Sequence, residues 1–222
     1  MKLPVSKRLL ACCEYVHPGD RIADVGCDHG YLGIHLLQQN IASSVIASDI
    51  NQGPLDAAKR NAVKYGFGDK MSFFLSDGVQ KIPRDFDTLI CAGMGADTMV
   101  SILEGAPWLA DSQYRLILQC QSKTPMLRKY LSEKGWSIKE EAVLKDGRFL
   151  YTVMEVVYAP SPKLTPGACY LPPALFVKPT EYLNDYCTRV VNELEKIVSA
   201  QKENADPYQI QALQELKNGG IL

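Results

Sequence analysis

The stretch IKEEAVLKDGRFLYTVMEVVY, residues 138–158, decides the fold class that we predict for this chain. It consists of two runs rich in apolar and β-branched residues, 138–144 and 148–158, on either side of the tripeptide KDG. Asp-Gly favours a tight turn between antiparallel strands, because both turn positions tolerate positive φ. The stretch therefore predicts an antiparallel β-hairpin.

Upstream of this hairpin, short apolar runs alternate with amphipathic stretches, which is typical of a parallel sheet covered by helices. We expect strands at 21–25, 44–48, 71–75, 86–91 and 114–119, and helices at 31–40, 53–65, 96–106 and 123–134. A mainly parallel sheet that ends in an antiparallel hairpin is the layout of the class I methyltransferases. The dinucleotide-binding Rossmann sheet continues instead with a parallel sixth strand.

Downstream of the hairpin the pattern changes. Proline recurs from Pro160 to Pro179, which predicts a linker without helix because proline disfavours helix interiors. Apolar residues then recur at helical spacing, and a second helix is expected after Asp206. The expected parts are an α/β methyltransferase-like domain, a linker and a C-terminal helical hairpin, at residues 1–159, 160–180 and 181–222.

Length and composition limit the protein class. A chain of 222 residues with 46% hydrophobic composition can bury a substantial core. No apolar run reaches the roughly 20 residues that cross a bilayer, and the first residues lack a signal-peptide pattern. We therefore expect a cytoplasmic protein with no membrane partner, as a monomer or weak homodimer.

The cysteines and the charges suggest no metal site and no strongly basic surface. The seven cysteines show no paired CxxC spacing, so we expect reduced core residues and no metal. A formal net charge of -1 is not typical of a nucleic-acid binder. Basic residues nevertheless cluster near the N-terminus and between 123 and 139, as solvated faces or as phosphate-binding patches.

The heptapeptide DVGCDHG, residues 24–30, ends the first expected strand and opens a helix. Gly26 and Gly30 allow the backbone to approach a ligand closely. Asp28 disfavours a pyrophosphate there because like charges repel, and it favours a ligand with cationic groups. S-adenosylmethionine, which carries a sulfonium and an ammonium, is such a ligand. A purely structural turn between strand and helix is the alternative.

Other acids and glycines follow the next strands. Asp49 comes after the second strand, where a carboxylate can accept two ribose hydroxyls. Asp77 and Gly78 come after the third strand. At this position a carboxylate can accept a hydrogen bond from the adenine amino group, while glycine allows the ligand to approach closely. Gly93 and Met94 come after the fourth, where Met94 packs either on adenine or in the core.

Six segments, in this order and spacing, resemble the bacterial tRNA adenine-22 N1-methyltransferase family (TrmK type): DVGCDHGYLGIHLL, VIASDINQGPLDAAKRNA, SDG, CAGMGA, LILQCQSKTPMLRKYL and GRFLYTVMEVV. The resemblance extends from about Val5 to Tyr158. It implies methyl transfer from S-adenosylmethionine to N1 of an adenine in the D-arm region of tRNA. It also implies a class I domain followed by a helical, coiled-coil-like part.

The resemblance further implies the residues that hold the cofactor. These are Asp24, Gly26, Asp28, His29, Gly30, Asp49, Ile50, Asp77, Gly78 and Met94, and we add Gly93 from its place beside the transferred methyl group. The stretch Ser6–Leu9 matches a basic N-terminal element of the family. Two departures lie where the target base is expected, at Ala96 and Cys120.

The expected chemistry needs no obligatory base, because adenine N1 has its own lone pair and orientation can supply most of the acceleration. Asp28 is a candidate for stabilising the cationic product, and Tyr31 for orienting or stacking on the base. N1 lies on the Watson–Crick edge, so the adenine must first be exposed. The candidate substrate contacts are Lys7, Arg8, Gln119, Gln121, Lys123, Arg128 and Lys129.

Other functions remain open at this point. Cys91 and Cys120 end two expected strands, where cytosine C5-methyltransferases acting on RNA place their cysteines. A methyltransferase acting on another RNA position or on a small molecule is a second possibility. A non-catalytic module that binds tRNA or a partner and retains a cofactor pocket is a third.

Overall fold

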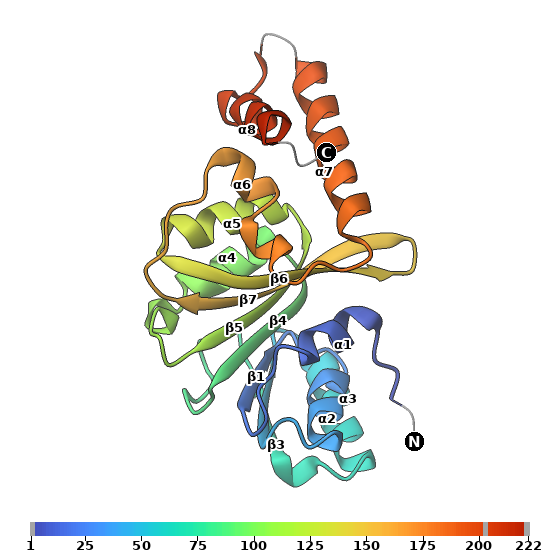
Figure 1. Ribbon diagram of the computed structural model, residues 1–222. Coiled ribbons are helices and arrows are strands. Elements are labelled where there is room, and N and C mark those ends of the chain that lie inside the picture. Colours follow the sequence, from blue (N-terminus) through green and yellow to red (C-terminus); the bar gives the residue numbers. More distant parts are fainter. Residues whose placement is uncertain (1–2, 202–203, 220–222) are drawn as a thin grey trace.

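The computed structural model describes residues 3–201 and 204–219, so the outermost ends of the two expected domains lie outside the described residues. Seven strands form one sheet (Figure 1). They are β1 (Arg21–Val25), β2 (Ser44–Asp49), β3 (Met71–Leu75), β4 (Thr88–Gly95), β5 (Arg115–Ser122), β6 (Trp136–Asp146) and β7 (Phe149–Tyr158).

The strand order is β3-β2-β1-β4-β5-β7-β6. Strands β1 to β5 run parallel, and β7 is antiparallel to both β5 and β6. The predicted fold class, an α/β sheet of the class I methyltransferase type that ends in an antiparallel hairpin, is confirmed. Because the carboxyl ends of β1, β2 and β4 meet at one edge, the chemistry-bearing loops come together there.

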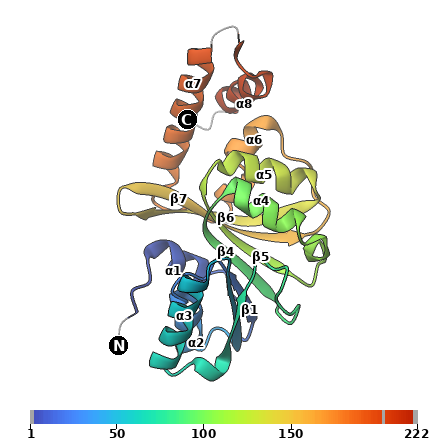
Figure 2. The same cartoon turned by 180° about the vertical axis from the view of Figure 1, so that it is seen from behind.

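Helices cover both faces of the sheet (Figures 1 and 2). One face carries α1 (Lys7–Cys13), α2 (Tyr31–Gln38) and α3 (Gln52–Lys64), and the other carries α4 (Ala96–Glu104) and α5 (Thr124–Glu133). Two 3-10 turns, η1 (Gly68–Lys70) and η2 (Pro107–Leu109), lie in the connections. Each layer has its own apolar core, so the sheet is buried on both sides.

Helix α1 is an element that the sequence patterns did not predict. Ser6 caps it, because its Oγ accepts a hydrogen bond from the Leu9 amide at 3.4 Å. Cys12 and Cys13 face the core. The short helix thereby places Arg8 beside the carboxyl ends of the strands.

Strand β4 continues further than expected. Residues 93–95, predicted to follow the strand, belong to it, with a bulge in its pairing to β5 between Ala92 and Met94. Gly93 has φ +81°, a conformation that favours glycine. The bulge turns the end of β4 toward the loop after β1.

The expectation that residues 160–180 contain no helix is wrong. Helix α6 (Pro166–Tyr170) and the 3-10 turn η3 (Pro173–Phe176) lie within this segment. In both, proline occupies the first turn, where its missing N–H costs nothing, and the Thr165 side chain caps α6. Proline here begins the helical turns that its abundance was expected to prevent.

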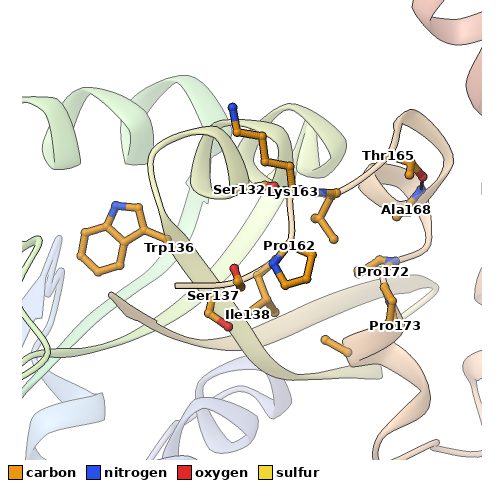
Figure 3. A pocket seen from close by; sticks show the side chains of 13 residues that line it. Ser132, Trp136, Ser137, Ile138, Pro162, Lys163, Thr165, Ala168, Pro172 and Pro173 are labelled. Carbon is orange, nitrogen blue, oxygen red and sulfur yellow. Dashed lines mark hydrogen bonds between the residues drawn. The ribbon is translucent and has the colours of Figure 1, made fainter. Parts of the chain in front are cut away.

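The same segment packs against the end of α5 and the start of β6. The Leu164 amide donates a 2.7 Å hydrogen bond to Ser132 Oγ. Between segment and sheet lies a mostly apolar cavity of about 340 Å³, lined by Trp136, Ile138 and several prolines (Figure 3). The segment is therefore an ordered layer over this end of the sheet.

The predicted C-terminal helices are present as α7 (Leu183–Gln201) and α8 (Pro207–Asn218). They form a third apolar cluster with Leu171, Leu175 and Val143 of β6. Figure 1 shows α7 rising from the β6–β7 hairpin with α8 beside it and above α6. No helix in residues 3–201 or 204–219 is long and apolar enough to cross a membrane.

Candidate active site

A cavity of about 280 Å³ lies at the carboxyl ends of β1 and β4, between the loop after β1 and helix α1. This volume is close to the lower end for small-molecule sites, about 300 Å³. The structure brings eight of the predicted site residues to it: Arg8, Asp24, Gly26, Asp28, His29, Tyr31, Gly93 and Gln121.

Four residues that line the cavity were not predicted. They are Leu9, Cys27, Leu32 and Ala92. All are apolar or weakly polar, so residue type alone does not mark them. Each lies next to a predicted position in the chain or within its motif, and that adjacency was the available signal.

The loop after β1 alternates residues with positive φ, at Gly26 (+71°), Asp28 (+50°) and Gly30 (+70°). A Cβ on Gly26 would collide with the Met94 methyl group, and one on Gly30 would lie 2.9 Å from the Ala58 Cβ. Packing against α3 therefore requires glycine at position 30, whereas at position 26 the flexible Met94 side chain can move and the positive φ is what favours glycine. Aspartate tolerates the left-handed conformation better than most residues, which explains how Asp28 fits between them.

Asp28 presents its carboxylate at the mouth of the cavity. Its side chain is 72% exposed, and one carboxylate oxygen lies 3.6 Å from His29 Nε2. The His29 ring is in turn 5.8 Å from the Tyr31 ring, centroid to centroid. The mouth of the cavity thus combines an acid, an imidazole and a phenol.

Asp24 is the buried acid of the site. Burial is the main reason that the pKa of its carboxyl is raised to about 7. A hydrogen bond from the Gly33 amide acts against this rise, and the nearby Asp49 charge adds to it. Among the described residues, no hydrogen-bond partner reaches its Oδ2. A buried carboxylate oxygen without a partner is costly, and a cationic ligand group would remove that cost.

Asp49 is held firmly at the end of β2. Its Oδ1 accepts from the Asn51 amide at 2.8 Å and its Oδ2 from the Asp28 amide at 3.2 Å. Each oxygen keeps a lone pair for a further donor. The neighbouring Ile50 is 63% exposed, which leaves an apolar surface beside the acid.

Asp77 and Gly78 are placed differently from each other. Asp77 is exposed at the end of β3, whereas Gly78 is buried with φ +55°. A Cβ on Gly78 would meet Ile102 side-chain atoms at 3.0 Å. Contact with α4 and the positive φ both favour glycine here, and the close approach of a ligand to Gly78 stays a prediction.

Gln119 is fully buried, and its predicted contact with substrate is wrong. Its Oε1 accepts from Arg8 Nη1 at 3.2 Å and from the Gly93 amide at 3.1 Å. Arg8 also donates through Nε to Asp146 at 3.2 Å. Gln119 therefore holds Arg8 and the β4 bulge in place through these hydrogen bonds. Gln121, two residues further along β5, is exposed and lines the cavity.

Arg128 is wrong as a phosphate contact, because its side chain has no exposed surface. Its Nη2 is 2.6 Å from Glu141 Oε1 and donates to the Tyr186 hydroxyl at 3.1 Å. The sequence placed Arg128 on an expected helix, but it could not show that Glu141 lies opposite.

The other predicted basic contacts differ in exposure. Lys7 and Lys123 are exposed, and Lys123 Nζ lies 2.8 Å from Asp97. Lys129 is half-buried, with its Nζ 4.3 Å from the Tyr208 ring centroid of α8. None of these three lines the 280 Å³ cavity.

Both candidate cysteines are buried, which disfavours their reactive thiolate form. Burial raises the pKa of the Cys91 thiol to about 12 and raises that of Cys120 as well. A thiol with a raised pKa supplies little thiolate at neutral pH. Within the described ranges, 3–201 and 204–219, no group of three or more His, Cys, Asp or Glu side chains could hold a metal ion.

Comparison with known proteins agrees with this geometry. A family model described as a methyltransferase domain matches residues 5–154. The tRNA (adenine(22)-N(1))-methyltransferase of Bacillus subtilis (strain 168) is 32% identical over 154 residues. This match covers 69% of the present chain and 65% of the B. subtilis protein.

Solved structures match over nearly the whole chain. The B. subtilis M1A22 tRNA methyltransferase TrmK has a TM-score of 0.81 at 26% identity, covering 98% of this chain and 96% of that one. Streptococcus pneumoniae Sp1610 in complex with S-adenosyl-L-methionine has a TM-score of 0.82 at 26% identity, covering 96% and 98%. The similarity therefore includes the C-terminal helices.

Proposed function

The chain belongs to the methyltransferase-domain family, and we propose that it transfers the methyl group of S-adenosylmethionine to N1 of an adenine in the D-arm region of tRNA. The observation that carries the proposal is the cavity at the sheet edge, with the unpartnered buried oxygen of Asp24 and the carboxylate of Asp28 at its mouth. Acids here favour a cationic ligand over a phosphate. A tRNA substrate implies a cytoplasmic protein, which acts as a monomer or weak homodimer.

The residues present fit S-adenosylmethionine. When bound, this cofactor supplies an electrophilic methyl group on a sulfonium. We assign the ammonium of its methionine part to Asp24, because Oδ2 lacks a partner. We assign hydrogen bonds from the ribose hydroxyls to Asp49, whose oxygens keep free lone pairs. We assign packing against the adenine ring to the exposed Ile50.

The remaining predicted cofactor residues act through the backbone or at the rim. We propose that Asp77 accepts a hydrogen bond from the amino group of the cofactor's adenine, since its carboxylate is exposed at the end of β3. The surrounding loops are shaped by the packing of Gly26, Gly30 and Gly78. The Met94 side chain packs against the loop at Gly26. Gly93 gives the β4 bulge its shape, and His29 braces the mouth between Asp28 and Tyr31.

Methylation at adenine N1 needs orientation and exclusion of water more than proton transfer, because the attacking nitrogen has a lone pair. We propose that Asp28 stabilises the positive charge that develops on the adenine, and that Tyr31 stacks on or orients the base. Arg8, with Lys7 and Lys123 further out, would hold nearby phosphates, and Gln121 reaches the cavity from the substrate side.

The test is transfer of radiolabelled methyl groups from S-adenosylmethionine to bulk tRNA, followed by nucleoside analysis. We expect 1-methyladenosine, and we expect tRNA binding to weaken steeply with salt because phosphate contacts release counterions. Asp28→Asn should lower turnover, and Tyr31→Ala should raise KM for tRNA. Cys120→Ser should leave activity largely unchanged.

Each alternative gives a different result in the same assay. A 5-methylcytidine product that is lost in Cys120→Ser would support cytosine chemistry. Label in a small-molecule acceptor, with none in tRNA, would support a small-molecule enzyme. Binding of S-adenosylmethionine and tRNA without any transfer would leave a non-catalytic binding module.

A further inference from the structure

Two aromatic rings, each with an arginine beside it, form a row from the turn of the β6–β7 hairpin toward the cavity. The Arg148 guanidinium carbon lies 4.9 Å from the Phe149 ring centroid, and the Phe149 and Tyr151 rings are 6.2 Å apart. Arg8, which lines the cavity, lies 5.3 Å from the Tyr151 ring centroid. We call Arg148, Phe149, Tyr151 and Arg8 the hairpin ladder.

The hairpin ladder borders a groove of about 680 Å³ between the hairpin, the start of α5 and helix α7. Phe149 and Tyr151 line this groove from β7. Gln121 lines both the groove and the 280 Å³ cavity. The two spaces are therefore adjacent, so an RNA strand whose reacting base enters the cavity can place a neighbouring base in the groove.

Packing within the described chain does not account for Phe149. Its relative exposure is 48%, so much of the ring stays in water and contributes little to folding. Phe149 has the Arg148 guanidinium on one side and the Tyr151 ring on the other. Such an exposed ring is a surface on which nucleobases stack, because every base has a π-face and arginine adds a cation–π contact. The ladder thus has the chemistry of a stacking platform.

The charges along the groove agree with stacking as the main interaction. Lys123 Nζ lies 2.8 Å from Asp97, and Arg189 Nε lies 3.8 Å from Glu193. Both cations of the groove wall therefore have a carboxylate partner, whereas the Phe149 ring is open to a ligand. Recognition in this groove depends on the aromatic surface more than on an excess of positive charge.

We propose that the hairpin ladder stacks the unpaired nucleobase next to the target adenine, with Phe149 as the ring in contact. This inference rests on the proposed function. Methylation at N1 requires the adenine to leave its base pair, which also removes the stacking partner of its neighbour. The hairpin ladder would replace that partner and keep the strand open.

The test compares Phe149→Ala with wild type in methyl transfer to tRNA. We expect KM for tRNA to rise roughly 5- to 140-fold, the range for losing one base–aromatic stack. Affinity for S-adenosylmethionine, measured by calorimetry, should not change. A tRNA transcript with 2-aminopurine beside the target adenine should stay quenched on binding wild type, because Phe149 replaces the lost stacking partner. It should become brighter on binding Phe149→Ala, because the base is then left unstacked.

Two variants serve as controls. Phe149→Tyr retains the ring and should behave like wild type. Phe176→Ala removes a phenylalanine of similar exposure, 44%, that lies outside the groove, and it should change nothing. Equal KM and equal quenching in Phe149→Ala and wild type would overturn the inference. A loss of affinity for S-adenosylmethionine in Phe149→Ala as large as the rise in KM would overturn it too. A wild type that fails to methylate tRNA would refute the proposed function instead.

Discussion

Asp24 keeps a carboxyl group inside the protein with one oxygen unpaired. The pKa of this carboxyl is raised from 3.8 to about 7, mainly by burial. Between these two pH values the folded protein holds a proton that the unfolded chain has already released. The stability that this proton contributes is complete below the unfolded pKa of 3.8 and is lost as pH rises through about 7. At neutral pH the site is therefore electrostatically costly until a cation binds.

A pH dependence of cofactor binding follows from this cost. Affinity for S-adenosylmethionine should rise between pH 6 and pH 8, because binding its ammonium favours the ionised Asp24. Asp24→Asn should weaken binding roughly 10- to 100-fold, the value of a hydrogen bond to a charged group, and should flatten the pH profile. Isothermal titration calorimetry measures both. A profile with the same slope in wild type and Asp24→Asn would rule Asp24 out as the source.

The loop between β1 and α2 is the element whose backbone the site depends on most. Gly30 has φ +70° at the N-cap of α2, and a side chain there would press on Ala58 of α3. Gly30→Ala should therefore destabilise the protein by about 1–3 kcal/mol. It should also weaken cofactor binding, because the loop carries Asp28 and His29.

Gly53→Ala is the matched control for this loop. Gly53 lies in the first turn of α3 without a positive φ, and a Cβ there meets nothing within 4 Å. Alanine should stabilise the protein by about 0.4–1 kcal/mol by restricting the unfolded chain. Urea unfolding measures the stability of both variants. Equal changes in Gly30→Ala and Gly53→Ala would show that the loop after β1 does not require glycine at position 30.

At the scale of the whole molecule, Arg128 connects the methyltransferase-type sheet to the C-terminal helices. From α5 it reaches Glu141 of β6, the Cys169 and Tyr170 carbonyls of α6, and Tyr186 of α7. The contact with the Tyr170 carbonyl is partly buried, the others are buried, and the ion pair with Glu141 has no exposed side-chain surface. Removing the guanidinium would leave a buried carboxylate without its partner.

Arg128→Met should destabilise the protein by about 3–5 kcal/mol, as measured by urea unfolding. The double variant Arg128→Met/Glu141→Leu should recover most of this loss, because it removes the stranded charge. Lys123→Met breaks the exposed pair with Asp97 and should cost no more than about 1 kcal/mol. A small effect of Arg128→Met, similar to that of Lys123→Met, would mean that the buried pair does not join the two parts.

Much of the fold was predictable because its signals are local. The hairpin, the alternation of strands and helices, and the acids at strand ends depend on residues near one another in the chain. The same holds for seven of the eight predicted cavity residues, since parallel strands bring their carboxyl ends to one edge. The eighth, Arg8, is placed by α1, which the sequence patterns did not predict. The hairpin turn itself lies one residue later than the expected Asp-Gly turn, at Gly147 and Arg148, because Asp146 still pairs with Phe149. The exact domain boundaries and the ligand contacts of each residue stay predictions.

What the sequence by itself determined is the fold class, the family resemblance and the acidic loop that favours a sulfonium cofactor. Only the tertiary structure decided that Arg128 is buried, that Gln119 supports Arg8, and that the proline-rich segment contains α6. It also aligned the hairpin ladder with the cavity. The physical reason is that turn geometry and periodicity are set by neighbouring residues, whereas the environment of a charged or aromatic side chain depends on elements distant in the chain.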